Sequence, residues 1–243
     1  MKVFLIAGEA SGDKLGAALM TGLKQLTTPH FSGVGGPLMQ AEGMDSLFPM
    51  DELSIMGLAE VLPKYMHLKR RIAQTAQAVL EAEPDVLVTI DSPDFCLRVA
   101  KLVKARSTIR TVHYVAPSVW AWRPGRAAKM ARVIDHVLAL LPFEPPYMQA
   151  AGMDCDFVGH PVVAEPLASA AEAQAFRTRH GLHEAPLLLA LPGSRRGEVS
   201  RLAPRFGAAI GQVMQTRPDL RIVVPTTPNV TALVRDLTAT WPV

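Results

Sequence analysis

Short, continuous runs of apolar residues alternate with helix-forming segments along most of the chain, and this alternation constrains the fold more than any other feature. In the first two thirds of the chain the runs predict six strands, at residues 2–7, 31–34, 84–90, 111–115, 136–141 and 155–158. Strands that are apolar throughout are typical of parallel sheets that are buried on both faces, with the intervening helices as crossovers. We therefore predict an α/β fold with a doubly wound parallel sheet.

The pattern loosens after residue 160 into an Ala- and Glu-rich segment that ends at Gly181. Glycine is common just past the end of a helix, so this segment predicts a linker helix. Strands expected at 187–191 and 221–225 then begin a second unit of the same type.

These features predict three segments, at 1–164, 165–185 and 186–243. The first is expected to be a complete domain and the second a linker. Open α/β domains usually have five or six strands, so with two strands the third segment is expected to be a domain that is cut short.

The composition limits the possible functions. Hydrophobic residues make up 49% of the chain and charged residues 19%, as in a globular protein with a real core. The net charge of +3 is too small to indicate nucleic-acid binding, but it suits a surface near phosphates or lipid head groups. Cys96 and Cys155 lack metal-ligand spacing and favour a reducing cytoplasm. No apolar run approaches the roughly 18 residues of a spanning helix, so we expect any membrane contact to be peripheral.

Ligands of open α/β sheets bind beyond the carboxyl ends of the strands, so the loops that follow the strands are the candidate binding segments. The first such loop, 8–13, either contacts a ligand closely or is a glycine turn in which Ser11 or Asp13 caps the next helix. The glycines of 33–36 lack the spacing of a dinucleotide fingerprint and indicate a structural turn.

Asp91 and Asp94 flank a proline at the end of a strand. Pro93 predicts that a helix begins there, which places Asp94 at the helix cap or in its first turn. Asp91 lies at the strand terminus, where a general base would be aimed into the binding crevice.

Two of the three tryptophans lie in one loop beside an arginine. Trp120, Trp122 and Arg123 follow a predicted strand that includes His113. A hydrophobic core does not need this arrangement, whereas a site that must hold a ring and move a proton does.

The segment 192–198 joins a strand to a helix and contains Gly193, Ser194 and Arg195. Backbone amides at a helix N-terminus and a fixed guanidinium charge favour an anion site, and arginine suits bidentate binding of phosphate. The loop is not a Walker loop, because no Gly-Lys-Ser/Thr sequence follows at the right spacing.

The segment 47–71 combines several methionines with a basic cluster at 67–71. Methionines suit acyl chains and the cations suit phosphates. From these residues alone, an amphipathic helix with a solvated end is the preferred interpretation.

Together these motifs resemble the lipid-A-disaccharide synthase family, which joins two acylated glucosamines. The matching segments follow the family's order over nearly the whole chain, at 7–13, 36–43, 56–62, 90–95, 113–123, 141–144, 157–160 and 191–195. One such motif would be weak evidence, but the ordered set is specific.

The resemblance implies a GT-B glycosyltransferase with two Rossmann-like domains. The donor would be UDP-2,3-diacylglucosamine and the acceptor 2,3-diacylglucosamine 1-phosphate, giving a β-1,6-linked disaccharide phosphate and UDP with inversion. Asp91 matches the family position for the base, and Arg195 matches that of an arginine at the diphosphate. No metal or other cofactor is implied, because fixed positive charge can replace a metal.

The resemblance also assigns binding roles to further residues. The donor side comprises Gly193, Ser194 and Arg195 with Glu9, Ser11 and Gly12. The acceptor and lipid side comprises Met56, Leu58, Val61, Tyr65, Lys69, Arg70, Trp120, Trp122 and Arg123, which reverses the preference stated above for 47–71. The resemblance further implies a longer chain than this one, a homodimer in which the C-terminal segment is swapped, and action at the inner face of the inner membrane. No nucleic-acid partner is expected.

Two alternatives stay open. A related UDP-sugar enzyme, such as a sugar 2-epimerase, would have no use for the methionine-rich and basic segment. A non-catalytic fragment would bind acylated sugar phosphate or membrane without turnover. A nicotinamide oxidoreductase is disfavoured, because no Gly-x-Gly-x-x-Gly pattern follows the first strand.

Overall fold

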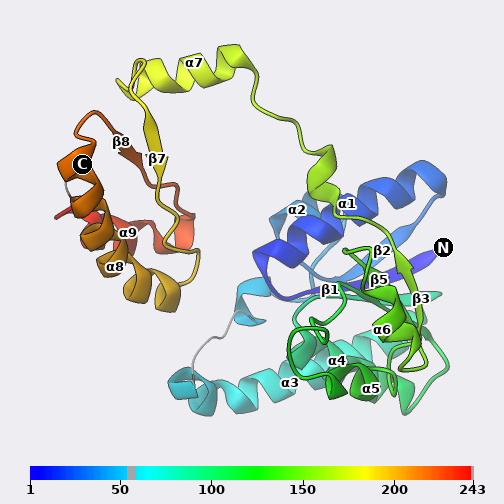
Figure 1. Ribbon diagram of the computed structural model, residues 1–243. Helices are drawn as coiled ribbons and strands as arrows, with labels where there is room; N and C mark the ends of the chain where they lie inside the picture. Colours follow the sequence, from blue (N-terminus) through cyan, green and yellow to red (C-terminus); the bar gives the residue numbers. More distant parts are fainter. Residues whose placement is uncertain (54–57, 242–243) are drawn as a thin grey trace. The chain divides into compact units, whose positions relative to one another are not determined.

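The computed structural model describes residues 1–53 and 58–241, with the backbone alone for 58–65. The chain divides into two compact units, Met1–Glu165 and Pro166–Val243. Each unit has its own parallel sheet and its own hydrophobic core (Figure 1).

The first unit is built on a six-stranded sheet in the order β2-β1-β3-β4-β5-β6, with every neighbouring pair parallel. Its strands are β1 (Lys2–Ala7), β2 (His30–Val34), β3 (Val86–Ile90), β4 (Arg110–Tyr114), β5 (His136–Ala139) and β6 (Asp154–Phe157). All six predicted strands are confirmed. The strands predicted at 84–90 and 136–141 are each two residues too long at one end.

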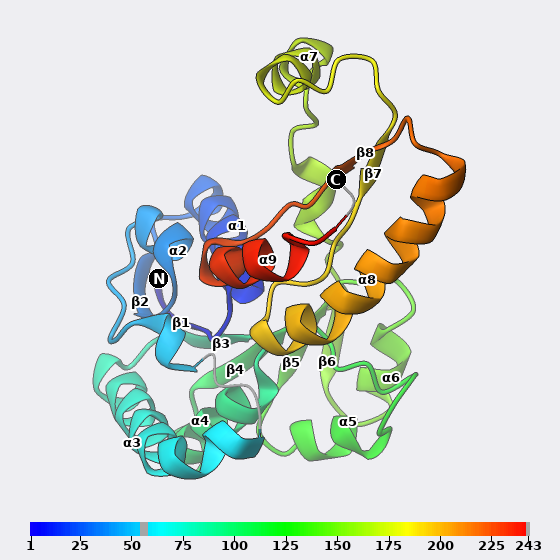
Figure 2. The same cartoon turned by 90° about the vertical axis from the view of Figure 1, so that its left-hand side faces the viewer.

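Helices cover both faces of this sheet (Figures 1 and 2). One face carries α1 (Ala10–Leu26) and α2 (Pro37–Ala41), and the other carries α3 (Leu58–Ala82) and α4 (Pro93–Lys104). The shorter α5 (Gly125–Met130) and α6 (Pro145–Gln149) pack with β5 and β6. Two 3-10 turns, η1 (Met50–Leu53) and η2 (Pro161–Ala164), complete the unit.

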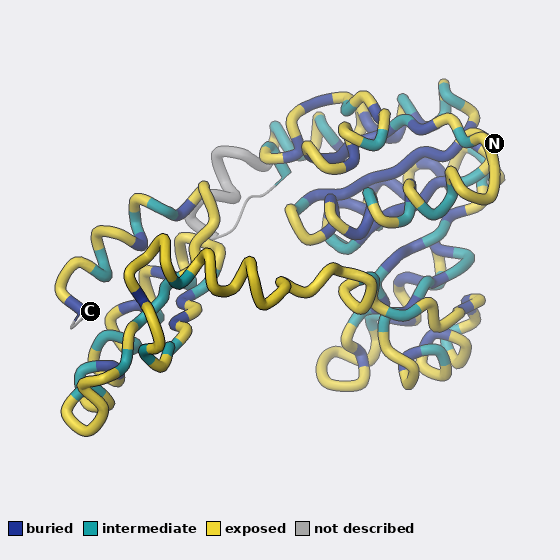
Figure 3. The backbone as a smooth tube through the Cα atoms, turned by 90° about the horizontal axis from the view of Figure 1, so that it is seen from above, coloured by how far each residue is buried: buried dark blue, intermediate teal, exposed yellow. Residues whose placement is uncertain are grey.

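The side chains of β1 explain why the strands are apolar throughout. Val3, Leu5 and Ala7 pack in the cluster with α1 and α2, whereas Phe4 and Ile6 pack in the cluster with α3 and α4. Successive side chains of a strand point to opposite faces, and both faces are covered here. Strands β1 to β4 are accordingly buried along most of their length, whereas β6 at the edge of the sheet is largely exposed (Figure 3).

The start of α1 differs from the prediction. The helix begins at Ala10 after Glu9, so Ser11 and Asp13 lie inside it and neither caps it. The buried Asp13 carboxylate instead accepts hydrogen bonds from the backbone amides of Gly36, Leu38 and Met39, at 2.9 to 3.0 Å. These bonds satisfy amides at the start of α2 that have no partner within that helix.

The second unit begins with α7 (Ala170–Arg179), which confirms the helix predicted before Gly181. Ser169 and Glu172 form a capping box at its start, and Gly181 takes the left-handed conformation, with φ +62°, after its end. No buried residue lies within α7.

The rest of the second unit is a small α/β layer. Strands β7 (Leu187–Leu189) and β8 (Arg221–Val223) pair in parallel. Helix α8 (Arg196–Thr216) follows β7. The 3-10 turn η3 (Pro228–Val230) and helix α9 (Thr231–Thr238) follow β8. The core of this layer includes Val199, Ile210, Val234 and Trp241.

Candidate active site

Two candidate carboxylates leave the first sheet from neighbouring strand ends. The last residues of β1 and β3, Ala7 and Ile90, are register partners. Glu9 lies two residues beyond Ala7, and Asp91 directly follows Ile90. The two loops touch, because a Cβ placed on Gly8 would lie 2.6 Å from the Ser92 hydroxyl. Gly8 therefore allows the β1 loop to approach the Asp91 loop.

The backbone at this edge adopts uncommon conformations. Asp91, Ser92 and Val115 all have positive φ, at +49°, +41° and +89°. Such values are uncommon for residues other than glycine, and in a β-branched residue such as Val115 they indicate strain. Strained backbone gathers at functional sites, where the surrounding structure enforces it.

Hydrogen bonds to the next strand hold two of these residues. The amide of Asp91 donates to the carbonyl of Tyr114, and the amide of Val115 donates to the carbonyl of Leu138, both at 3.0 Å. The ladder thus continues one residue past β3 and β4 while the chain turns away. Asp91 is fixed at the point where β3 ends and α4 begins.

The first turn of α4 confirms the predicted place of Asp94 in that helix. Pro93 begins the helix and Asp94 lies exposed in its first turn. Cys96, one turn further on, is fully buried, and burial raises the pKa of its thiol far above the ordinary value. That thiol stays protonated and is not a nucleophile.

His113 has a structural role. It lies within β4, with 2% of its surface exposed and its Nδ1 2.7 Å from the Thr89 hydroxyl. Burial lowers the pKa of its imidazole to about 4, so the ring is neutral at pH 7. His113 is therefore not the proton-moving group that was predicted beside the tryptophans.

The predicted aromatic loop is exposed and is joined by a second loop. Trp120 and Trp122 are 45% and 58% exposed. The ring of Trp120 packs edge to face on Phe143 in the β5–α6 loop, with ring centroids 5.2 Å apart. The Arg123 guanidinium lies 4.1 Å from the Trp122 ring centroid, and that of Arg126 lies 5.9 Å from it.

Phe143 and Arg126 were missed as site residues. The signal for Phe143 was its position just after β5, because the loop after the neighbouring strand β4 carries Trp120. The spacing of Arg126, three residues after Arg123, was the corresponding signal for the second cation.

The expected lipid segment is described in part. Met56 lies outside the described residues, and Leu58, Val61 and Tyr65 are placed as backbone of α3 only. Lys69 and Arg70 are exposed on α3. That helix packs against α4 and β2, whereas Trp120 packs on the β5–α6 loop.

The basic cluster at 67–71 is divided between two roles. Arg71 makes two 2.7 Å hydrogen bonds to the Glu52 carboxylate, and the His67 ring contacts the same carboxylate at 2.6 Å. The hydrogen bonds from Arg71, helped by His67, hold the pKa of Glu52 below its usual value. His67 and Arg71 therefore tie η1 to α3, which leaves Lys69 and Arg70 as the outward cations.

The candidate anion loop lies in the second unit. Arg195 is the N-cap residue of α8, and Gly193 has φ +120°, a conformation that favours glycine. The loop is held by two side chains that were not predicted as site residues. Glu198 accepts hydrogen bonds from the Ser194 amide at 3.3 Å and from the Arg195 guanidinium at 3.2 Å, and the Asn229 side chain donates to the Ser194 carbonyl at 3.0 Å. A carboxylate thus already lies at the place predicted for an anion.

A family model described as lipid-A-disaccharide synthetase matches residues 3–238. The chain belongs to this family. A lipid-A-disaccharide synthase from Ruegeria pomeroyi is 69% identical over the whole chain, and one from Rhodospirillum centenum is 53% identical over 99% of it. The chain spans 61% of the length of each of these relatives.

Solved structures share the fold at low sequence identity. A UDP-GlcNAc 2-epimerase from Neisseria meningitidis, bound to UDP-GlcNAc, matches with a TM-score of 0.68 at 13% identity, covering 99% of this chain and 70% of its own. A UDP co-structure of MnaA from S. aureus matches with a TM-score of 0.70 at 12% identity, covering 99% and 67%. The predicted GT-B-like α/β fold is confirmed.

Two kinds of feature are absent from the described part of the chain. No helix there is long and apolar enough to cross a membrane. No group of three or more His, Cys, Asp or Glu side chains there is arranged to hold a metal ion.

Proposed function

We propose that this chain carries the activity that gives its family its name. In this proposal UDP-2,3-diacylglucosamine is joined to 2,3-diacylglucosamine 1-phosphate, and the products are the β-1,6-linked disaccharide 1-phosphate and UDP. The observation that supports it most is the family match over 3–238 together with the carboxylate of Asp91 at a strained strand end.

Asp91 is the proposed general base. Its carboxylate would take the proton of the acceptor 6-hydroxyl as that oxygen attacks the anomeric carbon of the donor. The bond between that carbon and the UDP oxygen breaks in the same step, so the configuration inverts and no covalent enzyme intermediate forms. Asp91 is held by the hydrogen bond from its amide to Tyr114, and a well-placed base contributes roughly 10²–10⁴-fold to the rate.

Arg195 and the loop before α8 are the proposed diphosphate site. The guanidinium, the amides of Gly193 and Ser194, and the N-terminus of α8 would stabilise the negative charge on departing UDP. Glu198 would have to release Arg195 for this to happen. The structural neighbours bound to UDP-GlcNAc and UDP support a sugar-nucleotide donor.

The first turn of α1 is the second proposed contact with the donor, through Glu9, Ser11 and Gly12. Gly12 is buried, and a Cβ there would lie 3.3 Å from Ala7 and 3.4 Å from the Ile90 carbonyl oxygen. Its contribution would therefore come from its backbone amide, since α1 packs there with no room for a side chain.

The exposed aromatic and basic residues are the proposed acceptor and lipid contacts. Trp120 and Trp122 with Arg123 combine amphipathic rings with a cation, the combination found at membrane interfaces. Lys69 and Arg70 would add charge, and the remaining residues of this set are Met56, Leu58, Val61 and Tyr65. We propose peripheral association with the inner face of the inner membrane.

We propose a separate role for each of the three segments predicted from the sequence. Residues 1–164 would bind acceptor and lipid, 165–185 would connect, and 186–243 would contribute to the donor site. We also propose that the protein forms a homodimer, as the resemblance to its family implies.

A disaccharide-formation assay in mixed micelles tests the proposal. It compares this chain with a chimera that carries the remaining residues of the Ruegeria pomeroyi relative. Turnover by both, or by the chimera alone, supports the proposed reaction and tells which residues it needs. If neither protein forms disaccharide, and UDP-N-acetylglucosamine is converted in the absence of detergent, the 2-epimerase alternative is favoured.

A further inference from the structure

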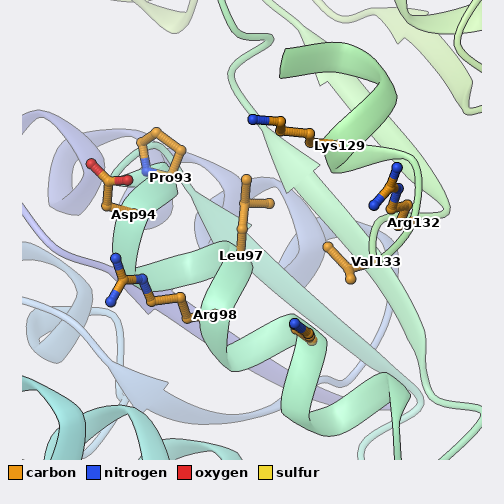
Figure 4. Close-up of a pocket in the computed structure, with 8 residues that line it drawn as sticks. Pro93, Asp94, Leu97, Arg98, Lys129, Arg132 and Val133 are labelled. Carbon is orange, nitrogen blue, oxygen red and sulfur yellow. The ribbon is translucent and has the colours of Figure 1, made fainter. Parts of the chain in front are cut away.

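A basic groove lies between α4 and α5, and one end of it is lined by Pro93 and Asp94 in the first turn of the helix that follows Asp91. It has a volume of about 360 Å³. Its walls carry Arg98 and Lys101 from α4, and Lys129 and Arg132 at and just after α5, while Leu97 and Val133 form an apolar floor (Figure 4). We call these four cations with their floor the basic groove.

The charge of this region is not that of the whole chain. The stretch 95–134 contains no Asp or Glu, although the net charge of the chain is only +3. Its Lys and Arg residues are Arg98, Lys101, Lys104, Arg106, Arg110, Arg123, Arg126, Lys129 and Arg132. The region is therefore strongly positive in a protein that is nearly neutral.

Three of these cations already have partners. Lys104 pairs with Asp135 at 2.6 Å, Arg110 pairs with Asp154 at 3.3 Å, and Arg106 donates to Gln77 at 3.2 Å. They serve the structure of the unit.

The four cations of the basic groove differ from these. They are exposed, and none makes an ion pair or hydrogen bond within the described part of the chain. Asp94 is the one carboxylate that lines the groove, so the lining carries an excess of positive charge. Cations that line one groove repel each other, and an anion bound there relieves that repulsion.

We propose that the basic groove binds the phosphate groups of anionic lipid head groups at a membrane surface. Arginine binds phosphate oxygens bidentately, and lysine adds a mobile point charge. Arg123, Arg126, Lys129 and Arg132 recur every third residue, so the groove continues the basic run that begins beside the exposed Trp122. Tryptophan next to cations is typical of residues at the lipid–water boundary.

This inference extends the proposed membrane association and does not depend on the proposed chemistry. Vesicle binding needs no substrate and no turnover. An absence of disaccharide formation would not contradict lipid binding by the basic groove, and an absence of vesicle binding would not contradict the proposed reaction.

The test is co-sedimentation of the 243-residue chain with vesicles of equimolar phosphatidylglycerol and phosphatidylcholine, beside vesicles of phosphatidylcholine alone. The groove variant combines Arg98→Gln, Lys101→Gln, Lys129→Gln and Arg132→Gln. The matched control combines Lys2→Gln, Lys24→Gln, Arg106→Gln and Arg110→Gln, which removes the same charge from exposed cations that have partners in the structure.

We expect the affinity of the groove variant for the anionic vesicles to be at least about tenfold lower. Each cation near such a surface contributes measurably to binding, and the variant removes four of them. The control variant should lose much less, and added salt should weaken the wild-type binding. An equal loss in both variants would show that only net charge matters and would overturn the site. No loss in the groove variant would do the same.

Two further arms separate the sources of phosphate. Titration with inorganic phosphate, in the absence of vesicles, should give no saturable binding. Tight binding there would assign the groove to a free phosphate, and preferential retention of a single-stranded RNA oligonucleotide would assign it to nucleic acid. Should the fourfold variant fail to fold by circular dichroism, the pair Lys101→Gln and Lys129→Gln is compared with Lys24→Gln and Arg110→Gln by the same criterion.

Discussion

The loop that follows β3 and the loop that precedes α8 both join a strand to a helix, yet they hold their charged side chains by different means. Asp91 sits in a strained turn whose amide bonds to the next strand, above a buried sheet. Arg195 sits in an exposed loop and is held by the side chain of Glu198, three residues further along the chain.

The difference suggests different tasks. A base must be aimed within a fraction of an ångström, and a strained backbone enforced by a core can do that. A phosphate-binding arginine must exchange one anion for another, and an exposed ion pair is weak enough to be exchanged.

The largest effect is expected from Asp91→Asn, tested in the chimera that carries the remaining residues of the Ruegeria pomeroyi relative. Loss of the carboxylate removes the proposed base, so the rate of disaccharide formation should fall by roughly 10²–10⁴-fold. Donor binding should change little. Asp94→Asn, an equal change of charge three residues away, is the matched control and should keep nearly the wild-type rate. A wild-type rate in the Asp91 variant would sink the assignment of the base.

The next effect concerns the second loop. Arg195→Ala should weaken binding of UDP by about tenfold or more, since a hydrogen bond to a charged group contributes roughly 1.5–3 kcal/mol. Calorimetric titration of UDP measures it. Arg196→Ala removes the same charge from the exposed neighbouring residue and should bind UDP as the wild type does. Equal affinities of all three proteins would remove Arg195 from the diphosphate site.

A third prediction concerns His113 in β4, the strand beside β3 that supports the Asp91 loop. The pKa of His113 is lowered by burial to about 4, against about 6.5 in the unfolded chain. The unfolded state therefore binds more protons between these values, and stability is lost as the pH falls through that window. At pH 5 the free energy of unfolding should be about 2 kcal/mol lower than at pH 7.5 on account of this residue.

Urea unfolding at the two pH values, followed by circular dichroism, measures this difference. His113→Gln cannot titrate, so its stability should depend less on pH, whatever its absolute stability. His30→Gln, at an exposed position in β2, should keep the wild-type dependence. An unchanged pH dependence in the His113 variant would mean that another group causes it.

The sequence was sufficient to predict the strands and the position of Asp91. A strand covered on both faces must be apolar throughout, so β1 and β3 could be recognised from composition alone. The proline after Asp91 likewise marked the start of α4.

Contacts between distant segments could not be predicted in this way. Asp13 looked like a cap for its own helix, but its carboxylate binds the amides of α2, more than twenty residues along the chain. Phe143, in the β5–α6 loop, packs on Trp120 because β5 lies beside β4, a strand order that was not predicted. The positive φ of Asp91, at a residue whose amide bonds to the next strand, has no signature in the sequence.

The smallest effect is the sharpest test of the contrast, because it concerns the side chain that holds Arg195. Glu198→Gln removes the charge that competes with a phosphate, so UDP should bind more tightly, by a factor of about two to five for an exposed pair. Asp219→Asn removes an equal charge from the exposed pair with Arg217 in the same unit and should leave UDP affinity unchanged. Weaker binding by the Glu198 variant would show that the carboxylate positions Arg195 for the ligand, and the second loop would then be preorganised in the same sense as the first.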